Sequence, residues 1–358
     1  MPLALYPQTP ELAPKQCLRQ GGLLMSHPTC YCSGMNEKMT HETRLRKDNT
    51  DFNNVRFRLA LLELPRVGRK TAARIAASIT DGFPNSAHEL YDLCQRSATS
   101  GIRIPQVDIR TVENAFDRAE QILEKSDKLN IQVYPYGDDR FPAHFWDMKE
   151  DSPQVMFVKG HVESLKSNTN AAVIGTRNPT PWGLEAGKRL VQVLSESEIT
   201  IVSGLALGCD TVAHEGCLEA GGLTVAVLAH GLDMVQPLKN KNLAERIIHS
   251  GGCLISEYEV GKIIRPNQFI ERNRLQAALS KALIVIETST KGGTMHAVRH
   301  GQKLHRLLAC INHPYDLLKS PTTEGNQDLI KTAQAFPLGN PKEVKNFIQQ
   351  MKISDSSS

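Results

Sequence analysis

Six short apolar runs alternate with segments of helical periodicity in the second half of the chain. The runs are 171–174, 199–202, 223–228, 253–255, 282–286 and 307–311. Runs this short that are rich in Val, Ile and Leu are typical of strands covered on both faces. The pattern therefore predicts an α/β fold, with a doubly wound, Rossmann-like parallel sheet forming the core of residues 126–335.

Residues 51–125 have helical periodicity instead. An apolar stretch ending near Leu64 leads into a short turn centred on Gly68 and then a second helix. This arrangement resembles a helix-hairpin-helix (SAM-like) domain, whose Gly-hydrophobic-Gly turn presents backbone N–H groups to a DNA phosphate. Here Arg66 replaces the first glycine, and Gly68, Arg69 and Lys70 are candidates for a secondary DNA contact. A small helical packing domain with a solvated basic face is the alternative interpretation.

The two ends of the chain are more polar. Residues 1–50 have weak periodicity and are expected to form a poorly ordered extension. Residues 336–358 are expected to form a C-terminal tail that ends in a Ser-rich stretch.

The composition changes this picture little. The 358 residues contain 42 Lys and Arg against 38 Asp and Glu, a net charge of +4, which permits nucleic-acid binding without predicting it. No apolar run is long enough to span a bilayer, and no signal peptide is expected. Eight scattered cysteines indicate reduced thiols in a cytoplasm.

A metal site is not predicted. The N-terminal extension does contain a loose group of potential ligands, Cys17, His27, Cys30, Cys32 and His41. Their spacing matches no common zinc pattern, because Cys-x-Cys lacks the usual two-residue gap.

Two glycine-containing turns carry the strongest functional signal. Gly175-Thr176-Arg177 and the segment beginning at Ser203-Gly204 each leave a predicted strand and open onto a helix. Such turns meet at the carboxyl edge of a parallel sheet, where helix N-termini and free N–H groups bind anions. The forked donor of Arg177 suits a phosphate. Neither turn is G-x-G-x-x-G, so no dinucleotide cofactor is predicted.

Later turns add positive charge and one aromatic side chain. Lys239 and Lys241 flank the start of a predicted helix, and Gly292-Gly293 opens another. Phe269 can stack on a base, with two arginines close behind it in the sequence, Arg272 and Arg274. An ion-pair cluster at a helix start remains the alternative for these arginines.

An enzyme acting on a small nucleotide needs a general base and a positioned water. The candidates near the turns are Asp210, His214, Glu257 and Glu287, and their spacing does not define a catalytic set. Asp210 also suits a helix cap, and no partner base for Cys209 is evident.

The motifs and their order resemble the DNA-processing protein A family, also called DprA or Smf. The family's Gly-Ser-Arg turn corresponds to 175–177, and its Ser-Gly-Leu-Ala-x-Gly-Ile-Asp-x-x-Ala-His motif to 203–214, with Cys209 for the isoleucine. Its Tyr-Pro-x-x-Asn-x-x-Leu motif corresponds to 236–243 and its Phe-Pro-x-Arg-Asn-Arg motif to 269–274. Gly325 and Asn326 fit the closing motif.

The resemblance implies a Rossmann-like core that binds single-stranded DNA, forms a homodimer and loads the recombinase RecA in natural transformation, without catalysis, cofactor or membrane. Leu238 replaces an expected basic residue, which leaves open whether Lys239 or Lys241 takes its role. The alternatives are a nucleotide sensor or nucleotide-processing enzyme that uses the same pocket, and a partner-binding protein without DNA affinity. The expected DNA contacts are Gly175, Thr176, Arg177, Ser203, Gly204, Lys239, Lys241, Phe269, Arg272, Arg274, Gly292 and Gly293.

Overall fold

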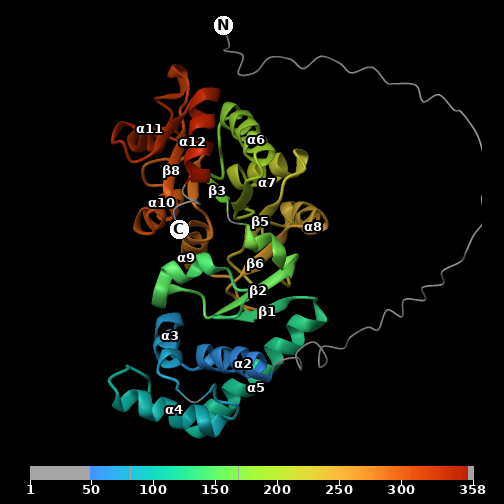
Figure 1. Cartoon of the computed structure of the whole chain (residues 1–358), viewed down its shortest axis with the longest axis vertical. Coiled ribbons are helices and arrows are strands. Elements are labelled where there is room, and N and C mark those ends of the chain that lie inside the picture. Colours follow the sequence, from blue (N-terminus) through green and yellow to red (C-terminus); the bar gives the residue numbers. More distant parts are fainter. Residues whose placement is uncertain (1–48, 81, 168, 354–358) are drawn as a thin grey trace, which may run out of the picture. The chain divides into compact units, whose positions relative to one another are not determined.

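The computed structural model describes residues 49–80, 82–167 and 169–353 (Figure 1). The chain from Asp48 onward clusters as one compact unit. The predicted extension over residues 1–50, with its cysteines and histidines, lies almost entirely outside the described residues.

Four helices form the first described segment: α2 (Asn49–Glu63), α3 (Arg69–Ala77), α4 (Ala87–Thr99) and α5 (Ile109–Lys128). The side chains of Ser86 and Asp108 cap α4 and α5 by accepting backbone N–H groups three residues ahead. Helix α5 buries a stripe at three- and four-residue spacing that includes Phe116 and Ile122, and packs against α2 and β1. The helices predicted for this segment are present.

Nine strands form one sheet in the order β1-β2-β6-β5-β4-β3-β7-β8-β9. Strands β3 to β9 pair in parallel, and β1 and β2 add an antiparallel edge beyond β6. The prediction of a doubly wound parallel sheet is confirmed. The strands are β1 (Gln132–Pro135), β2 (Val155–Gly160), β3 (Asn170–Ile174), β4 (Thr200–Ser203), β5 (Thr224–Val227), β6 (Cys253–Ser256), β7 (Ala282–Val285), β8 (Leu307–Ile311) and β9 (Phe336–Leu338).

Helices cover both faces of the sheet (Figure 1). Alternate residues of β3 pack on opposite sides: Ala171 and Val173 join the core under α6, α7 and α12, whereas Ala172 and Ile174 join the core under α9 and α10. The helices are α6 (Pro181–Glu196), α7 (Cys209–Glu219), α8 (Lys241–His249), α9 (Pro266–Ala278), α10 (Thr294–Lys303), α11 (Glu324–Lys331) and α12 (Pro341–Ile353). Short 3₁₀ turns are η1 (Ala143–Asp151), η2 (Val162–Lys166), η3 (Leu238–Asn240) and η4 (Tyr315–Leu317).

The expectation that residues 336–358 form a C-terminal tail is wrong for residues 336–353. Residues 336–338 form β9, which pairs with β8, and α12 follows directly. Phe347 and Met351 of α12 are buried in the core that also contains β3 and β7. This part of the chain is ordered because its apolar face covers the end of the sheet.

Strand β3 is the point where the strand order reverses. The chain runs from β3 through β4 and β5 to β6 on one side, and α9 then returns it to β7 on the other side of β3. The loops after β3 and β7 leave in different directions, which opens a crevice at the carboxyl edge. No helix in the described part of the chain is long and apolar enough to cross a membrane.

Candidate functional site

A cavity of about 380 Å³ lies at this reversal point. Its walls come from the turn after β3, the turn after β4, helix α9 and the turn after β7. Elements far apart in the sequence thus meet where α/β sheets usually bind ligands. The predicted site residues that line it are Gly175, Thr176, Arg177, Phe269, Arg272, Gly292 and Gly293.

The turn that carries Arg177 is held from two sides. The Thr176 N–H donates to the Glu287 carbonyl (2.8 Å) after β7, and the Thr176 carbonyl accepts the Cys209 N–H (3.1 Å) at the start of α7. Arg177 itself is exposed, and its guanidinium carbon lies 5.4 Å from the Phe269 ring centroid. A cation and an aromatic ring therefore stand together at the cavity wall.

Glu287 anchors the same turn through its side chain. Its fully buried carboxylate accepts the Thr180 N–H (2.8 Å) and hydroxyl (2.5 Å) and lies 3.3 Å from His313 Nε2. Burial alone would raise the pKa of Glu287, but the hydrogen bonds from His313 and Thr180 outweigh it and lower that pKa. The carboxylate is a structural acceptor outside the cavity lining.

Arg272 and Asp210 form the inner polar part of the cavity. Arg272 Nη1 donates to the Val227 carbonyl (2.9 Å) and lies 4.0 Å from the Asp210 carboxylate. Burial raises the pKa of Asp210 although the Arg272 charge opposes this, and burial lowers the pKa of Arg272. The guanidinium of Arg272 beside Asp210 offsets the negative charge that an entering anion meets.

Gly204 makes room for Arg272. A Cβ atom at position 204 would lie 1.3 Å from Arg272 Nη1. Neither Gly204 nor Ser203 lines the cavity, and the Ser203 hydroxyl donates to the Val173 carbonyl (2.6 Å). These two predicted contacts therefore support the cavity from behind.

Lys239 and Lys241 are exposed and lie outside the cavity lining. They flank Asn240, whose amide donates to the Leu205 carbonyl (2.9 Å) of the turn after β4. The lysines are thus attached to one wall of the cavity and face solvent.

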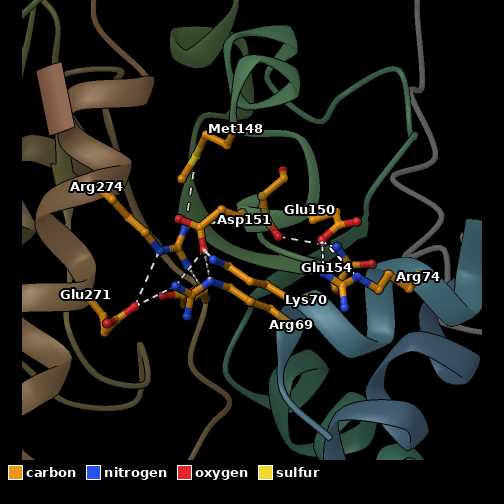
Figure 2. Close-up of polar contacts among 11 residues, drawn as sticks. Arg69, Lys70, Arg74, Met148, Glu150, Asp151, Gln154, Glu271 and Arg274 are labelled. Atoms are coloured by element: carbon orange, nitrogen blue, oxygen red, sulfur yellow. Dashed lines mark hydrogen bonds and ion pairs between the residues drawn. The ribbon is translucent and has the colours of Figure 1, made fainter. Parts of the chain in front are cut away.

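Arg274, an expected DNA contact, lies outside the cavity lining and joins an ion-pair cluster, which was the alternative interpretation. Its side chain is 1% exposed, pairs with Glu257 and donates to the Asp151 carbonyl (2.9 Å). One position after Asn273 on α9, it points away from the cavity. Of the expected secondary contacts, Gly68 precedes α3, whereas Arg69 and Lys70 meet the same Asp151 (Figure 2).

The candidate catalytic residues do not come together. Only Asp210 lines the cavity. His214 is fully buried, contacts Thr224 Oγ1 (2.7 Å), and has a pKa lowered to about 3 by burial and by Arg272. Burial also raises the pKa of Cys209, which disfavours the thiolate.

The prediction that Asp210 caps a helix is wrong. Gly208 is the N-cap of α7, and Asp210 lies in its first turn, where its carboxylate accepts the Ala206 N–H (3.3 Å). Among the described residues, no cluster of three His, Cys, Asp or Glu side chains is arranged to hold a metal ion.

The sequence analysis missed several polar residues of the lining. Asn273 and Gln276 follow Phe269 at four- and seven-residue spacing and share its face of α9, so helical periodicity was the available signal. Thr288 and Ser289 belong to the turn after β7 and Thr294 begins α10, whereas the sequence analysis named only Gly292 and Gly293 there.

The sequence profile of the family described as DNA recombination-mediator protein A matches residues 132–349, more than half of the chain. The chain belongs to this family. The match spans the sheet and its helices, and begins after α5. The matched range therefore includes every residue that lines the cavity described above.

Individual relatives agree with this assignment. Protein Smf of Synechocystis sp. is 36% identical over 189 residues, 52% of this chain and 47% of the relative. Protein Smf of Escherichia coli is 32% identical over 220 residues, 62% and 57% of the two chains. The chain thus spans about half the length of these curated relatives.

Two solved structures of family members are similar. DNA processing protein A from Streptococcus pneumoniae superposes with a TM-score of 0.66 at 24% identity, covering 82% of this chain and 97% of the other, which shows the shared fold. DNA processing protein A from Helicobacter pylori, described as having a unique single-stranded DNA binding mode, has a TM-score of 0.54 at 29% identity, covering 62% and 97%.

Proposed function

We propose that this protein binds single-stranded DNA at the cavity, protects it, and delivers it to RecA in the cytoplasm of cells that undergo natural transformation. The observation that carries the proposal is the exposed guanidinium of Arg177 beside Phe269, on a turn tied to β7 and α7. The guanidinium suits a phosphate and the ring suits a base. The family membership and the relative described as binding single-stranded DNA support it.

The proposal gives other residues a role in binding. Lys239 and Lys241, exposed beside the turn after β4, extend the positive surface along which a strand runs. At the start of α10 the Gly292 N–H already donates to the Ser289 carbonyl (3.2 Å), and the N–H of Gly293 in the cavity lining adds a neutral donor for a phosphate oxygen. Arg272 supplies positive charge deeper in the cavity.

The first test is fluorescence anisotropy of labelled single- and double-stranded oligonucleotides over a salt series. We expect preference for the single strand and a steep loss of affinity with salt. Arg177→Ala should weaken binding by about tenfold, and should lower the slope of log K against log salt by about 0.7, the value for one phosphate contact on a single strand.

Arg189→Ala is the matched control, because Arg189 is exposed on α6 and pairs with Glu185 away from the cavity. It removes the same charge and should leave affinity unchanged. Equal binding by Arg177→Ala and the parent would exclude Arg177 as a phosphate contact.

The finer steps need separate measurements. Light scattering with and without DNA tests the homodimer. RecA filament growth on an oligonucleotide should start earlier with the parent than with Arg177→Ala. If the parent does not accelerate filament growth, the protein binds DNA without loading RecA.

A small-nucleotide sensor or enzyme is the alternative use of this cavity. Asp210 is the one candidate base that lines it. Burial raises the pKa of Asp210, and a carboxylate with a raised pKa is a stronger base, when ionised, than an ordinary aspartate. Mononucleotides that compete with DNA at micromolar concentration, or are hydrolysed, would favour this alternative.

A further inference from the structure

The basic side chains of α3 form ion pairs with carboxylates of η1 and α9, and Lys70 and Arg74 remain more than half exposed (Figure 2). Arg74 pairs with Glu150 of η1 (2.8 Å). Arg69 pairs with Asp151 of η1 (2.7 Å) and with Glu271 of α9 (2.7 Å). We call this set, together with Lys70, Glu257 and Arg274, the α3 network.

Arg69 is the bridge of the α3 network. Its Nε donates to Asp151 (2.8 Å) while one terminal nitrogen reaches both Asp151 and Glu271. Burial would lower the pKa of Arg69, but the surrounding carboxylates, Glu257 first, outweigh it and raise that pKa. A planar guanidinium can span two carboxylates in this way, whereas a lysine ammonium acts as a single point charge.

Helix α9 connects the network to the cavity. Phe269, Arg272 and Asn273 face the cavity, whereas Glu271 and Arg274 face the network. Arg274 is almost fully buried, so the network side of α9 is fixed by charged contacts as well as by packing. A rotation of α9 that breaks these contacts also moves Phe269 relative to Arg177.

We propose that Arg69 is a positioning residue for the cavity, which holds α9 against η1 and α3 through Glu271 and Asp151. Arg69 of the helix-hairpin-helix-like turn then acts within the molecule and not on a DNA phosphate. The effect on DNA affinity rests on the proposed function, but the effect on α9 itself does not.

The test combines Arg69→Met, Arg69→Lys, Glu271→Gln and the double variant Arg69→Met/Glu271→Gln. We expect Arg69→Met and Glu271→Gln each to weaken single-strand binding by roughly three- to tenfold. The double variant should weaken it by less than the product of the two factors, because both single variants lose the Arg69–Glu271 pair. The salt slope should stay at the parent value. Arg69→Lys should resemble Arg69→Met, since it keeps the charge but loses the bridge.

Hydrogen exchange of the α9 amides is the second readout, and it should rise in every one of these variants. Arg118→Met is the control: Arg118 lies on α5 and faces Glu63 of α2 at 3.9 Å, so it is not a member of the α3 network. It should change neither affinity nor α9 exchange.

A direct phosphate contact predicts a different pattern. Arg69→Met would then lower the salt slope by about 0.7, Arg69→Lys would bind nearly like the parent, and Glu271→Gln would bind as well or better. That pattern, or unchanged α9 exchange, overturns the proposal. If the parent fails to bind DNA, the proposed function fails, and α9 exchange alone decides whether Arg69 positions the helix.

Discussion

At the residue scale, the three arginines that the sequence analysis named as DNA contacts have different surroundings. Arg177 is exposed beside Phe269, Arg272 reaches a backbone carbonyl beneath the cavity, and Arg274 is buried among charged partners. Their positions on a turn and on two faces of one helix decide this, because all three carry the same guanidinium. Of these three arginines, only Arg177 has an exposed side chain that can adjust to the position of a phosphate group.

Gly208 shows how closely the cavity wall is packed. Its φ is +81°, and a Cβ atom there would lie 2.5 Å from the Arg177 carbonyl oxygen. We expect Gly208→Ala to lower the free energy of unfolding by about 2–4 kcal/mol, from backbone strain plus overpacking, and to weaken single-strand binding by displacing the Arg177 turn. Urea unfolding and anisotropy measure the two effects.

Gly221→Ala is the control for Gly208→Ala. Gly221 also has a positive φ of +69°, but a Cβ atom there meets nothing within 4 Å. This variant should show the strain cost alone and normal DNA affinity. Equal effects of the two variants would mean that the contact with Arg177 is unimportant.

At the element scale, the site depends on the junction between β7 and α6. Glu287, just after β7, accepts both polar hydrogens of Thr180, the N-cap of α6. The same Thr180 oxygen accepts the Gly183 N–H (3.0 Å). The turn from 175 to 180 is therefore closed at both ends before any ligand binds, which reduces the entropy lost on binding.

We expect Glu287→Ala to lower the free energy of unfolding by about 2–3 kcal/mol, because it leaves the Thr180 donors and His313 without this acceptor. Thr180→Val, which removes the cap and one of these bonds, should cost about 1 kcal/mol. DNA affinity should fall more in Glu287→Ala than in Thr180→Val. A smaller effect of Glu287→Ala in both urea unfolding and anisotropy would contradict the anchoring role.

At the scale of the whole molecule, two groups link stability to acid. His214 is buried with a pKa lowered to about 3, so below pH 6.5 the unfolded chain binds a proton that the folded chain does not. Burial would raise the pKa of Asp151, but Arg274 and Arg69 outweigh it and lower that pKa. Both groups stabilise the fold above their unfolded pKa and lose this contribution as pH falls.

The free energy of unfolding should therefore decrease over two overlapping ranges. From pH 6.5 down to about pH 3 the loss comes from His214, and it reaches about 2 kcal/mol by pH 5. Below about pH 4 a further loss comes from Asp151. Urea unfolding across pH should show the first loss absent in His214→Gln and the second reduced in Asp151→Asn; unchanged pH profiles would show that other groups control the acid range.

Local pattern alone determined the strands of the parallel sheet except β9, the helical first segment and the turns at the carboxyl edge, because periodicity and turn residues act over a few neighbouring positions. It also supplied Arg177 and Phe269, which the structure brings together. The missed Asn273 and Gln276 belonged to the same helix face, so their signal was local too.

Only the tertiary structure decided which charged residues face the cavity. Arg69 meets Asp151, 82 positions away, and Arg274 meets Asp151 across 123 positions. The burial of α12 and the anchoring by Glu287 likewise depend on distant segments. An arginine in sequence has the same charge everywhere, and its role is set by the carboxylates, carbonyls and solvent that the fold places around it.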